Sequence, residues 1–367
     1  MIHSKSLTYG HLNATARRLK MRDTQLLSRM VHALYLVEQL AVYGLSFMFK
    51  GGTCLSLLVN RIDRLSIDVD IEVSQAVSLE AIDSVLTSIC HSGTVFTDWE
   101  LQNRQNDRNE SRHYKVFYLP ILAVSHSNQE HILLDVVWTT SEHPCTVEHE
   151  LIHDALLIDG PPVRIVTPTI EGLLGDKLTA CAPLTVGVPI TMRSRTGMGR
   201  THNKHLEMIK QLFDVNVLIP RAVDWESVRR AYARTLDVQR QLFGQDYSNE
   251  QVTHDLCRRA LAMFNVLSTS YHPDLEFAHS TGHKSLRNYL VAPGDFLFEH
   301  VKMAALRAAY VAHCLQTGES PTRESQVGTS STPDNWTTKQ ITRGLSKTLR
   351  PEAVTLVSAL LDAGSYR

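Results

Sequence analysis

Two aspartates one residue apart are the first residues in this sequence whose types and spacing suggest chemistry. Asp68 and Asp70 lie in the run RLSIDVDIEV, where apolar residues alternate strictly with polar ones. The alternation predicts a half-buried β-strand over 67–73. Both aspartates then point to one face, because successive side chains of a strand point to opposite faces. Carboxylates placed in this way can share a divalent cation such as Mg²⁺ or Mn²⁺.

A third carboxylate, Asp135, lies in the middle of the run ILLDVVW. This run predicts another strand over 132–138, and a strand next to the first would bring Asp135 beside Asp68 and Asp70. Carboxylates in such an arrangement can hold two metal ions between an attacking hydroxyl and a phosphate. We therefore expect all three aspartates to be catalytic metal ligands, with Asp135 as third ligand or as base for the attacking hydroxyl.

A glycine turn flanked by lysine and threonine, KGGT, precedes the acidic strand. The pattern predicts a short strand over 45–49, then the turn, then a helix over 53–59. Amides at the start of a helix receive phosphate groups, and glycine lets a ligand approach the backbone closely. The lysine adds positive charge and the threonine adds a hydroxyl. We expect the nucleotide-binding residues of this turn to be Lys50, Gly51, Gly52 and Thr53.

Arg64 and Ser66 stand just before the acidic strand and complete the candidate nucleotide site. We expect Arg64 to contact a substrate phosphate and Ser66 to hydrogen-bond the metal ligands or the turn. A structural ion pair between Arg64 and an aspartate is the competing interpretation. A glycine pair or an Asp-x-Asp pattern alone is commonly structural, so it is their combination that predicts a reaction. That reaction is in-line displacement at the α-phosphate of a nucleoside triphosphate (NTP), with pyrophosphate leaving.

The elements around these residues predict an α+β fold, in which a mixed sheet with flanking helices is followed by a mainly helical half. Apolar residues at three- and four-residue spacing predict helices over 24–42, 79–89 and 205–219. Apolar runs predict strands over 114–124 and 163–166. Pro168 suits the first turn of a further helix that runs through residue 182.

The order of predicted strands, helices and polar stretches divides the chain into four segments. We expect a catalytic domain with N-terminal helices at 1–168, a helical domain forming the other wall of a cleft at 169–316, a polar linker at 317–336 and a helical segment at 337–367. The stretch 184–203, which contains Arg193, Arg195 and Arg200, is either a basic arm over nucleic acid or a solvated loop.

The composition is that of a folded protein without export or membrane signals. Hydrophobic residues make up 43% and charged residues 20% of the chain, which excludes a disordered polymer. The net charge of -1 excludes bulk electrostatic binding of nucleic acid and still allows a local basic groove. The six cysteines form no CxxC pair, and no long apolar run occurs. We expect a cytoplasmic protein with reduced thiols and no membrane partner.

The motifs KGGTCLSLL and RLSIDVDIEV resemble those of the AbiEii/MenT group of nucleotidyltransferase toxins, within the polymerase-β-like superfamily. Two later motifs extend the resemblance. EGLLGDKLTA, with Glu171 and Lys177, is similar to the Glu and Lys helix of that group, and KQLFDVNVL, with Asp214, is similar to its Asp-bearing helix. The resemblance covers roughly residues 25–220. This chain departs from the group where Lys210 and Gln211 replace its usual Arg-Asp pair.

The resemblance implies a polymerase-β-like nucleotidyltransferase core and adds residues that spacing alone does not assign. It implies that Lys177 contacts the nucleotide phosphates and that Asp214 is catalytic. It also implies a cognate antitoxin. Members of the group use an NTP, and several extend or cap the acceptor end of tRNA and so stop translation. By this resemblance the partners are tRNA, or another RNA acceptor, and the antitoxin.

Two other functions stay open at the level of sequence. The first is a nucleotidyltransferase that modifies a small molecule or a protein hydroxyl, because the catalytic core is the same. The second is a catalytically silent binding module that kept the fold. The sequence also leaves open which NTP is used and whether the chain is an oligomer.

Overall fold

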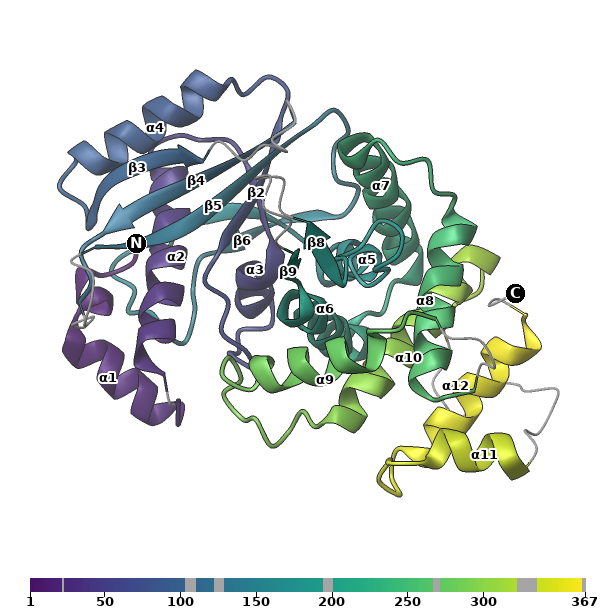
Figure 1. The fold of residues 1–367 in the computed structure, drawn as a ribbon. Coiled ribbons are helices and arrows are strands. Elements are labelled where there is room, and N and C mark those ends of the chain that lie inside the picture. Colours follow the sequence, from purple (N-terminus) through teal and green to yellow (C-terminus); the bar gives the residue numbers. More distant parts are fainter. Residues whose placement is uncertain are drawn as a thin grey trace. The chain divides into compact units, whose positions relative to one another are not determined.

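A computed structural model describes residues 1–21, 23–102, 110–121, 129–193, 201–266, 271–321 and 335–364. They form two compact units (Figure 1). Unit 1 contains Met1–Thr169 and Tyr289–Val291, and unit 2 contains Ile170–Asn288 and Ala292–Arg367. The predicted α+β class is confirmed, with a mixed sheet in unit 1 and mainly helices in unit 2. The four predicted segments stay a prediction, and residues 322–334 of the expected linker lie outside the described residues.

Unit 1 is built on a seven-stranded sheet with the strand order β3-β4-β5-β2-β1-β7-β6. The β2–β5 and β1–β7 pairs are parallel and the other pairs are antiparallel, so the sheet is mixed. The bounds of its strands are β1 Met48–Lys50, β2 Val69–Ser74, β3 Phe96–Gln102, β4 Ser111–Tyr118, β5 Glu130–Thr139, β6 Thr146–Glu150 and β7 Arg164–Pro168.

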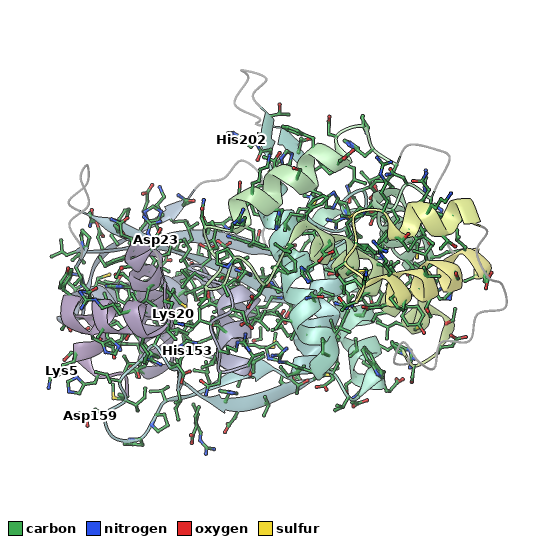
Figure 2. All side chains as sticks on the ribbon, turned by 90° about the horizontal axis from the view of Figure 1, so that it is seen from below. Lys5, Lys20, Asp23, His153, Asp159 and His202 are labelled. Atoms are coloured by element: carbon green, nitrogen blue, oxygen red, sulfur yellow. The ribbon has the colours of Figure 1, made fainter. Side chains whose placement is uncertain are left out.

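Helices cover one face of this sheet. They are the 3₁₀ helix η1 Ser4–Leu7 and the α-helices α1 Tyr9–Arg18, α2 Thr24–Val42, α3 Gly51–Leu58 and α4 Leu79–His91. The apolar residues of α2, α4 and the central strands form one core, which includes Leu34, Leu86, Ile71 and Val136. Asp23, labelled in Figure 2, begins α2 because its carboxylate accepts hydrogen bonds from two first-turn amides. The alternation along β2 therefore buries its apolar residues under α2 and leaves Asp70 on the opposite face.

Unit 2 consists of helices and one small hairpin. The elements are α5 Ile170–Thr179, β8 Thr191–Arg193, β9 Thr201–Asn203, α6 His205–Leu218, η2 Ile219–Arg221, α7 Trp225–Phe243, α8 Asn249–Met263, α9 Leu275–Leu286, α10 Phe298–Thr317, α11 Asn335–Thr342 and α12 Arg350–Asp362. None of the helices in the described part of the chain is long and apolar enough to cross a membrane.

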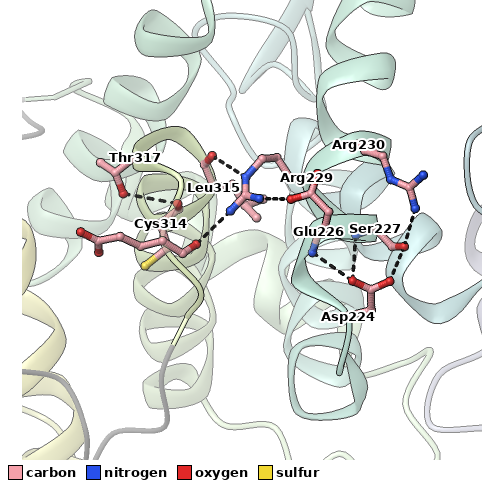
Figure 3. Close-up of polar contacts among 9 residues, drawn as sticks. Asp224, Glu226, Ser227, Arg229, Arg230, Cys314, Leu315 and Thr317 are labelled. Atoms are coloured by element: carbon pink, nitrogen blue, oxygen red, sulfur yellow. Dashed lines mark hydrogen bonds and ion pairs between the residues drawn. The ribbon is translucent and has the colours of Figure 1, made fainter.

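Polar contacts to main-chain atoms hold the helices of unit 2 together. Asp224 caps α7 by accepting hydrogen bonds from two amides of its first turn, and Arg229 of the same helix donates to the Leu315 carbonyl of α10 at 3.2 Å (Figure 3). Arg259 of α8 is 1% exposed and donates to the Cys181 carbonyl at 2.6 Å and to His279 of α9. A buried guanidinium is stable only with such partners, so Arg259 fixes these three segments.

Several predicted boundaries are wrong for identifiable reasons. Pro168 is the last residue of β7, where it pairs with Thr146, and the following helix begins at Ile170. Proline suits that place because a strand end can do without its N–H group. The expected loop 184–203 contains a hairpin, and its Arg195 and Arg200 lie outside the described residues. The strands β3 and β6 were not predicted, because edge strands with mostly exposed residues lack apolar alternation.

His32 of α2 lies inside the core of unit 1. Its side chain is fully buried, its Nδ1 atom hydrogen-bonds with the Ser28 carbonyl at 2.7 Å, and its ring stacks on Tyr118 with the centroids 4.0 Å apart. Desolvation by burial lowers the pKa of His32 from 6.5 to about 4. His153, labelled in Figure 2, has its pKa lowered to about 4 by the same cause.

The lowered pKa of His32 predicts how stability depends on pH. Between about pH 6.5 and 4 the unfolded chain binds a proton at this residue that the folded chain does not, so the free energy of unfolding falls as the pH is lowered through this range. The shift corresponds to roughly 3 kcal/mol for the one group. His32→Phe keeps an aromatic ring beside Tyr118 and should remove this part of the pH dependence in chemical denaturation.

The exposed His91 of α4 provides the comparison at the surface, because His91→Gln removes an imidazole that lies outside the core. Variants are compared by the change of their unfolding free energy with pH, which separates titration from any constant packing cost. An unchanged profile for His32→Phe would contradict the assignment.

Candidate active site

Four polar side chains form a row across neighbouring strands of unit 1. Lys50 of β1 pairs with Asp70 of β2, Asp70 pairs with Asp135 of β5, and Asp135 pairs with His113 of β4. Residues directly opposite one another in a sheet point to the same face. The predicted neighbours Asp70 and Asp135 are thus brought together on the face that does not carry the core, with a lysine at one end of the row and a histidine at the other.

The turn at Gly51 brings Asp70 to the start of α3. Gly51 has φ +81°, a left-handed conformation that side chains rarely adopt, and a Cβ atom at this position would overlap the Asp70 carboxylate. Glycine is therefore required for two reasons, backbone conformation and close approach. A phosphate received by the first amides of α3 would lie next to Asp70.

Gly52 also has close neighbours, which lie in the segment before β2. A Cβ atom here would lie 2.5 Å from Arg64 Nη2 and 2.7 Å from Ser66 Oγ, so both predicted residues lie against the turn. Both side chains are buried, at 6% and 8% exposure. A cation at the positive end of a helix is unfavourable by itself and favourable once an anion binds there. Arg64 and the α3 amides therefore form an arrangement suited to a bound phosphate.

A distant segment of the chain holds Arg64 in place. The Leu65 amide donates to the Tyr289 carbonyl at 2.8 Å and the Val291 amide donates to the Asp63 carbonyl at 3.1 Å, with Arg64 and Leu290 as bridge partners between them. This explains why Tyr289–Val291 belongs to unit 1. This contact could not be predicted, because no local sequence pattern marks a short backbone pairing between distant segments.

Thr53 positions the other aspartate. Its hydroxyl donates to the Asp68 carbonyl at 2.6 Å, and its side chain is fully buried. Asp68 itself lies just before β2 rather than inside it, since the strand begins at Val69. The hydroxyl that was expected to touch a phosphate thus connects α3 to the backbone of a candidate metal ligand, and the structure gives Thr53 a positioning role.

Glu72 is the third acidic residue on this face of β2, and it has different partners. Its carboxylate accepts from Lys50 Nζ at 3.2 Å and from Thr139 Oγ1 at 3.0 Å, and only 5% of its side chain is exposed. The pair holds the Lys50 ammonium close to the row. The alternation of the strand predicts Glu72 on the acidic face, whereas its ion pair depends on the β1–β2 register, which no local pattern predicts.

A hollow of about 640 Å³ adjoins Glu72 in unit 1. Its size lies in the range of ligand-binding pockets. Hydroxyl, acidic and apolar side chains line it, among them Met48, Glu72, Ser74, Thr139, Thr146 and Val166. The sheet therefore offers space for part of a substrate next to the charged row.

His113 and Asp135 form a close pair that was not predicted. Their Nδ1 and Oδ1 atoms are 2.6 Å apart, and the two side chains are 22% and 31% exposed. The signal was present in the run SRHYKVFY, where buried Tyr114 and Val116 alternate with residues facing the other way. Only the register with β5 shows that His113 lies opposite an aspartate.

The oxygen ligands on this face fit Mg²⁺ that arrives with a nucleotide. Among the described residues, no three His, Cys, Asp or Glu side chains are grouped to hold a metal ion by themselves. Mg²⁺ does not require such a group, because it is usually bound by one or two carboxylates together with substrate phosphates and water. Asp70 and Asp135 on adjacent strands, with Asp68 at the start of β2, provide that kind of partial site.

Lys177 and Asp214 form a buried ion pair in unit 2. Lys177 of α5 lies 2.9 Å from Asp214 Oδ2 of α6 and donates to Gln211 Oε1 at 3.1 Å. Asp214 is fully buried and the Lys177 side chain is 10% exposed. Gln211 thus binds the same ammonium as Asp214.

Gly51→Ala should lower stability more than the left-handed conformation alone explains. Gly44 is the matched control, because it has φ +82° and no atom lies within 4 Å of the position that its Cβ atom would take. Gly44→Ala should cost about 1–2 kcal/mol of unfolding free energy. Gly51→Ala should cost more and should also weaken NTP binding, because Asp70 has to move. Chemical denaturation and calorimetric titration measure the two effects, and equal behaviour of both variants would contradict this account.

Lys177→Met should lower the free energy of unfolding by about 3–5 kcal/mol, because Asp214 stays buried without its cation. The double variant Lys177→Met/Asp214→Asn should recover most of the loss, since neither member of the pair then carries a charge. Chemical denaturation near neutral pH measures both. Equal losses in the single and double variants would show that the two charges are not coupled.

A comparison with known protein families identifies the family of the chain. The family described as nucleotidyl transferase AbiEii toxin, type IV toxin–antitoxin system, matches residues 34–315. The curated proteins contain no match to the chain. The matched range includes the glycine turn, the acidic strand and the Lys177–Asp214 pair, and it covers most of the chain. The chain therefore belongs to the AbiEii nucleotidyltransferase toxins of type IV toxin–antitoxin systems, and it is a nucleotidyltransferase.

Proposed function

We propose that this toxin transfers a nucleotide from an NTP to the acceptor end of tRNA, releases pyrophosphate and thereby inhibits translation. The observation that carries the transfer chemistry is the register that places Asp70 between Lys50 and Asp135, with Gly51 of α3 against its carboxylate. This arrangement brings candidate metal ligands and a candidate phosphate site together. The tRNA acceptor itself rests on the resemblance to toxins that modify tRNA.

In this proposal Asp68, Asp70 and Asp135 hold Mg²⁺, or Mn²⁺, together with the triphosphate. The bound ion would polarise the phosphate and offset the charge that develops during displacement. Asp70 and Asp135 supply oxygens from adjacent strands, and the Thr53 hydroxyl supports Asp68 through its carbonyl. The chain's contribution is to hold these carboxylates in fixed positions before the substrate arrives.

The triphosphate binds at the start of α3 in this proposal. Backbone amides after Gly51 donate to its oxygens, Arg64 beside Gly52 adds a guanidinium, and Lys50 adds an ammonium held by Glu72. The acceptor hydroxyl oxygen forms a bond to the α-phosphorus as the bond from that phosphorus to pyrophosphate breaks. Asp135 accepts the hydroxyl proton, and the cationic groups stabilise the leaving pyrophosphate.

The cellular setting follows from the family and the substrate. A type IV toxin–antitoxin family implies a cognate antitoxin as partner. Because tRNA and NTPs are cytoplasmic, we place the activity in the cytoplasm. Growth inhibition would result from tRNA that can no longer be aminoacylated or used by the ribosome.

The direct test incubates purified protein with total tRNA, Mg²⁺ and each radiolabelled NTP in turn. Label should enter tRNA with the wild type, and Asp70→Asn and Asp68→Ala should reduce the rate by at least about a hundredfold, a loss typical of a removed electrostatic contact in an active site. Both variants should stay folded, because removing one carboxylate from an acidic group relieves repulsion.

The control is Asp159→Ala, which removes an aspartate side chain outside the row and should leave transfer unchanged. Full activity of Asp70→Asn would overturn the catalytic assignment. Label that enters a protein or small molecule instead of tRNA would keep the nucleotidyltransferase and replace the acceptor.

A further inference from the structure

His113 occupies the end of the charged row next to a candidate metal ligand. It lies directly opposite Asp135 in the β4–β5 ladder, and its Nδ1 atom is 2.6 Å from Asp135 Oδ1. On its other side Asp135 has Asp70 as its register partner. Asp135 is therefore flanked by a like charge on one strand and by a hydrogen-bond donor on the other. Asp70 repels the Asp135 carboxylate, whereas His113 attracts it.

We propose that His113 is a positioning residue that fixes the orientation of the Asp135 carboxylate for metal and acceptor binding. This inference rests on the proposed function. The terminal torsion of aspartate has a broad energy profile, so the carboxylate is not oriented by its rotamer alone. The hydrogen bond from Nδ1 engages Oδ1, which leaves Oδ2 to turn toward the Asp70 side of the row. A hydrogen bond to a charged acceptor is short and strong enough to hold that orientation.

The need for such a partner follows from the charge arrangement. Like charges directly opposite one another in a sheet repel, so Asp70 drives Asp135 away from the orientation in which both carboxylates share an ion. His113 counters this because it donates to Asp135 from the far side. Carboxylates that bind metals are commonly held by such outer hydrogen bonds, and their loss typically costs 10- to 100-fold in metal affinity or activity.

A second histidine of the same sheet face shows that the arrangement is particular to His113. His131 of β5 lies opposite Phe117 of β4, with its ring 5.8 Å from the phenylalanine ring. The His131–Phe117 pair belongs to the same β4–β5 ladder as the Asp135–His113 pair, and its side chains point to the same face of the sheet. The register partner of His131 is a phenylalanine and not a carboxylate. His131 is therefore a matched control for a histidine on this sheet face.

The experiment compares His113→Phe, His113→Asn and His131→Phe with the wild type. Phenylalanine keeps a ring without a donor, and asparagine offers an N–H group near the position of Nδ1. Mn²⁺ binding to the protein in the presence of a non-hydrolysable NTP analogue is measured from the electron paramagnetic resonance signal of free Mn²⁺, against the same analogue without protein. Transfer of label to tRNA gives kcat and KM for the NTP, and thermal denaturation gives Tm.

We expect His113→Phe to weaken Mn²⁺ binding and to lower kcat by roughly 10- to 100-fold, with little change of KM or Tm. His113→Asn should recover most of both losses, and His131→Phe should behave as the wild type. Wild-type Mn²⁺ affinity and kcat in His113→Phe would overturn the inference. A loss of Mn²⁺ affinity and kcat that is accompanied by a lower Tm and is not recovered in His113→Asn would also overturn it, in favour of a structural role.

The outcomes separate this inference from the proposed function. If the wild type binds Mn²⁺ and transfers label while His113→Phe matches it, the positioning role fails and the function stands. If the wild type does neither, the proposed function fails and the inference fails with it.

Discussion

The close approach of Asp70 to Gly51 is the constraint on which the candidate site depends. A carboxylate can lie against the first residue of α3 only if that residue has no Cβ atom and accepts a positive φ. The approach puts negative charge beside the positive end of a helix, which is favourable in the free protein. It also fixes where a metal ion held by Asp70 would meet a phosphate held by the helix. At Gly52 a Cβ atom would likewise meet the side chains of Arg64 and Ser66. Each glycine of the pair is therefore required by a different close contact.

The two faces of the sheet in unit 1 have different roles: one packs into the hydrophobic core and the other carries the candidate site residues. The residues of β2 that face α2 belong to the buried core, and those that face away include Asp70 and Glu72. Strand register then decides what each polar residue does. Asp70 has Asp135 and the glycine turn beside it, whereas Glu72 has Lys50 and Thr139. Two acidic residues of similar chemistry and neighbouring position thus differ in role because their partners differ.

The features that could be predicted from the sequence are those that a local pattern determines, such as strand alternation and a glycine turn. Alternation placed Asp70 on the polar side of its strand, and KGGT predicted a helix start after a buried strand. What depends on register could not be predicted, because one sequence does not state which residues of two strands lie opposite. His113 opposite Asp135 is such a case. Thr53 shows a second limit, because the direction of a hydroxyl depends on a carbonyl in another segment. Pro168 shows a third, since a proline can end a strand as well as begin a helix.

Within the described residues, Lys50 and Lys177 are both held by carboxylates that are themselves buried. Glu72 holds Lys50 in unit 1, and Asp214 holds Lys177 in unit 2. Buried ion pairs contribute little net stability, because the cost of removing both charges from water offsets most of their attraction. Stability alone is therefore a poor reason for either pair. Each pair instead fixes an ammonium group, whose long side chain would otherwise sample many rotamers. A lysine held in this way can meet an anionic ligand with little further loss of entropy, which is the property that a phosphate-binding residue requires.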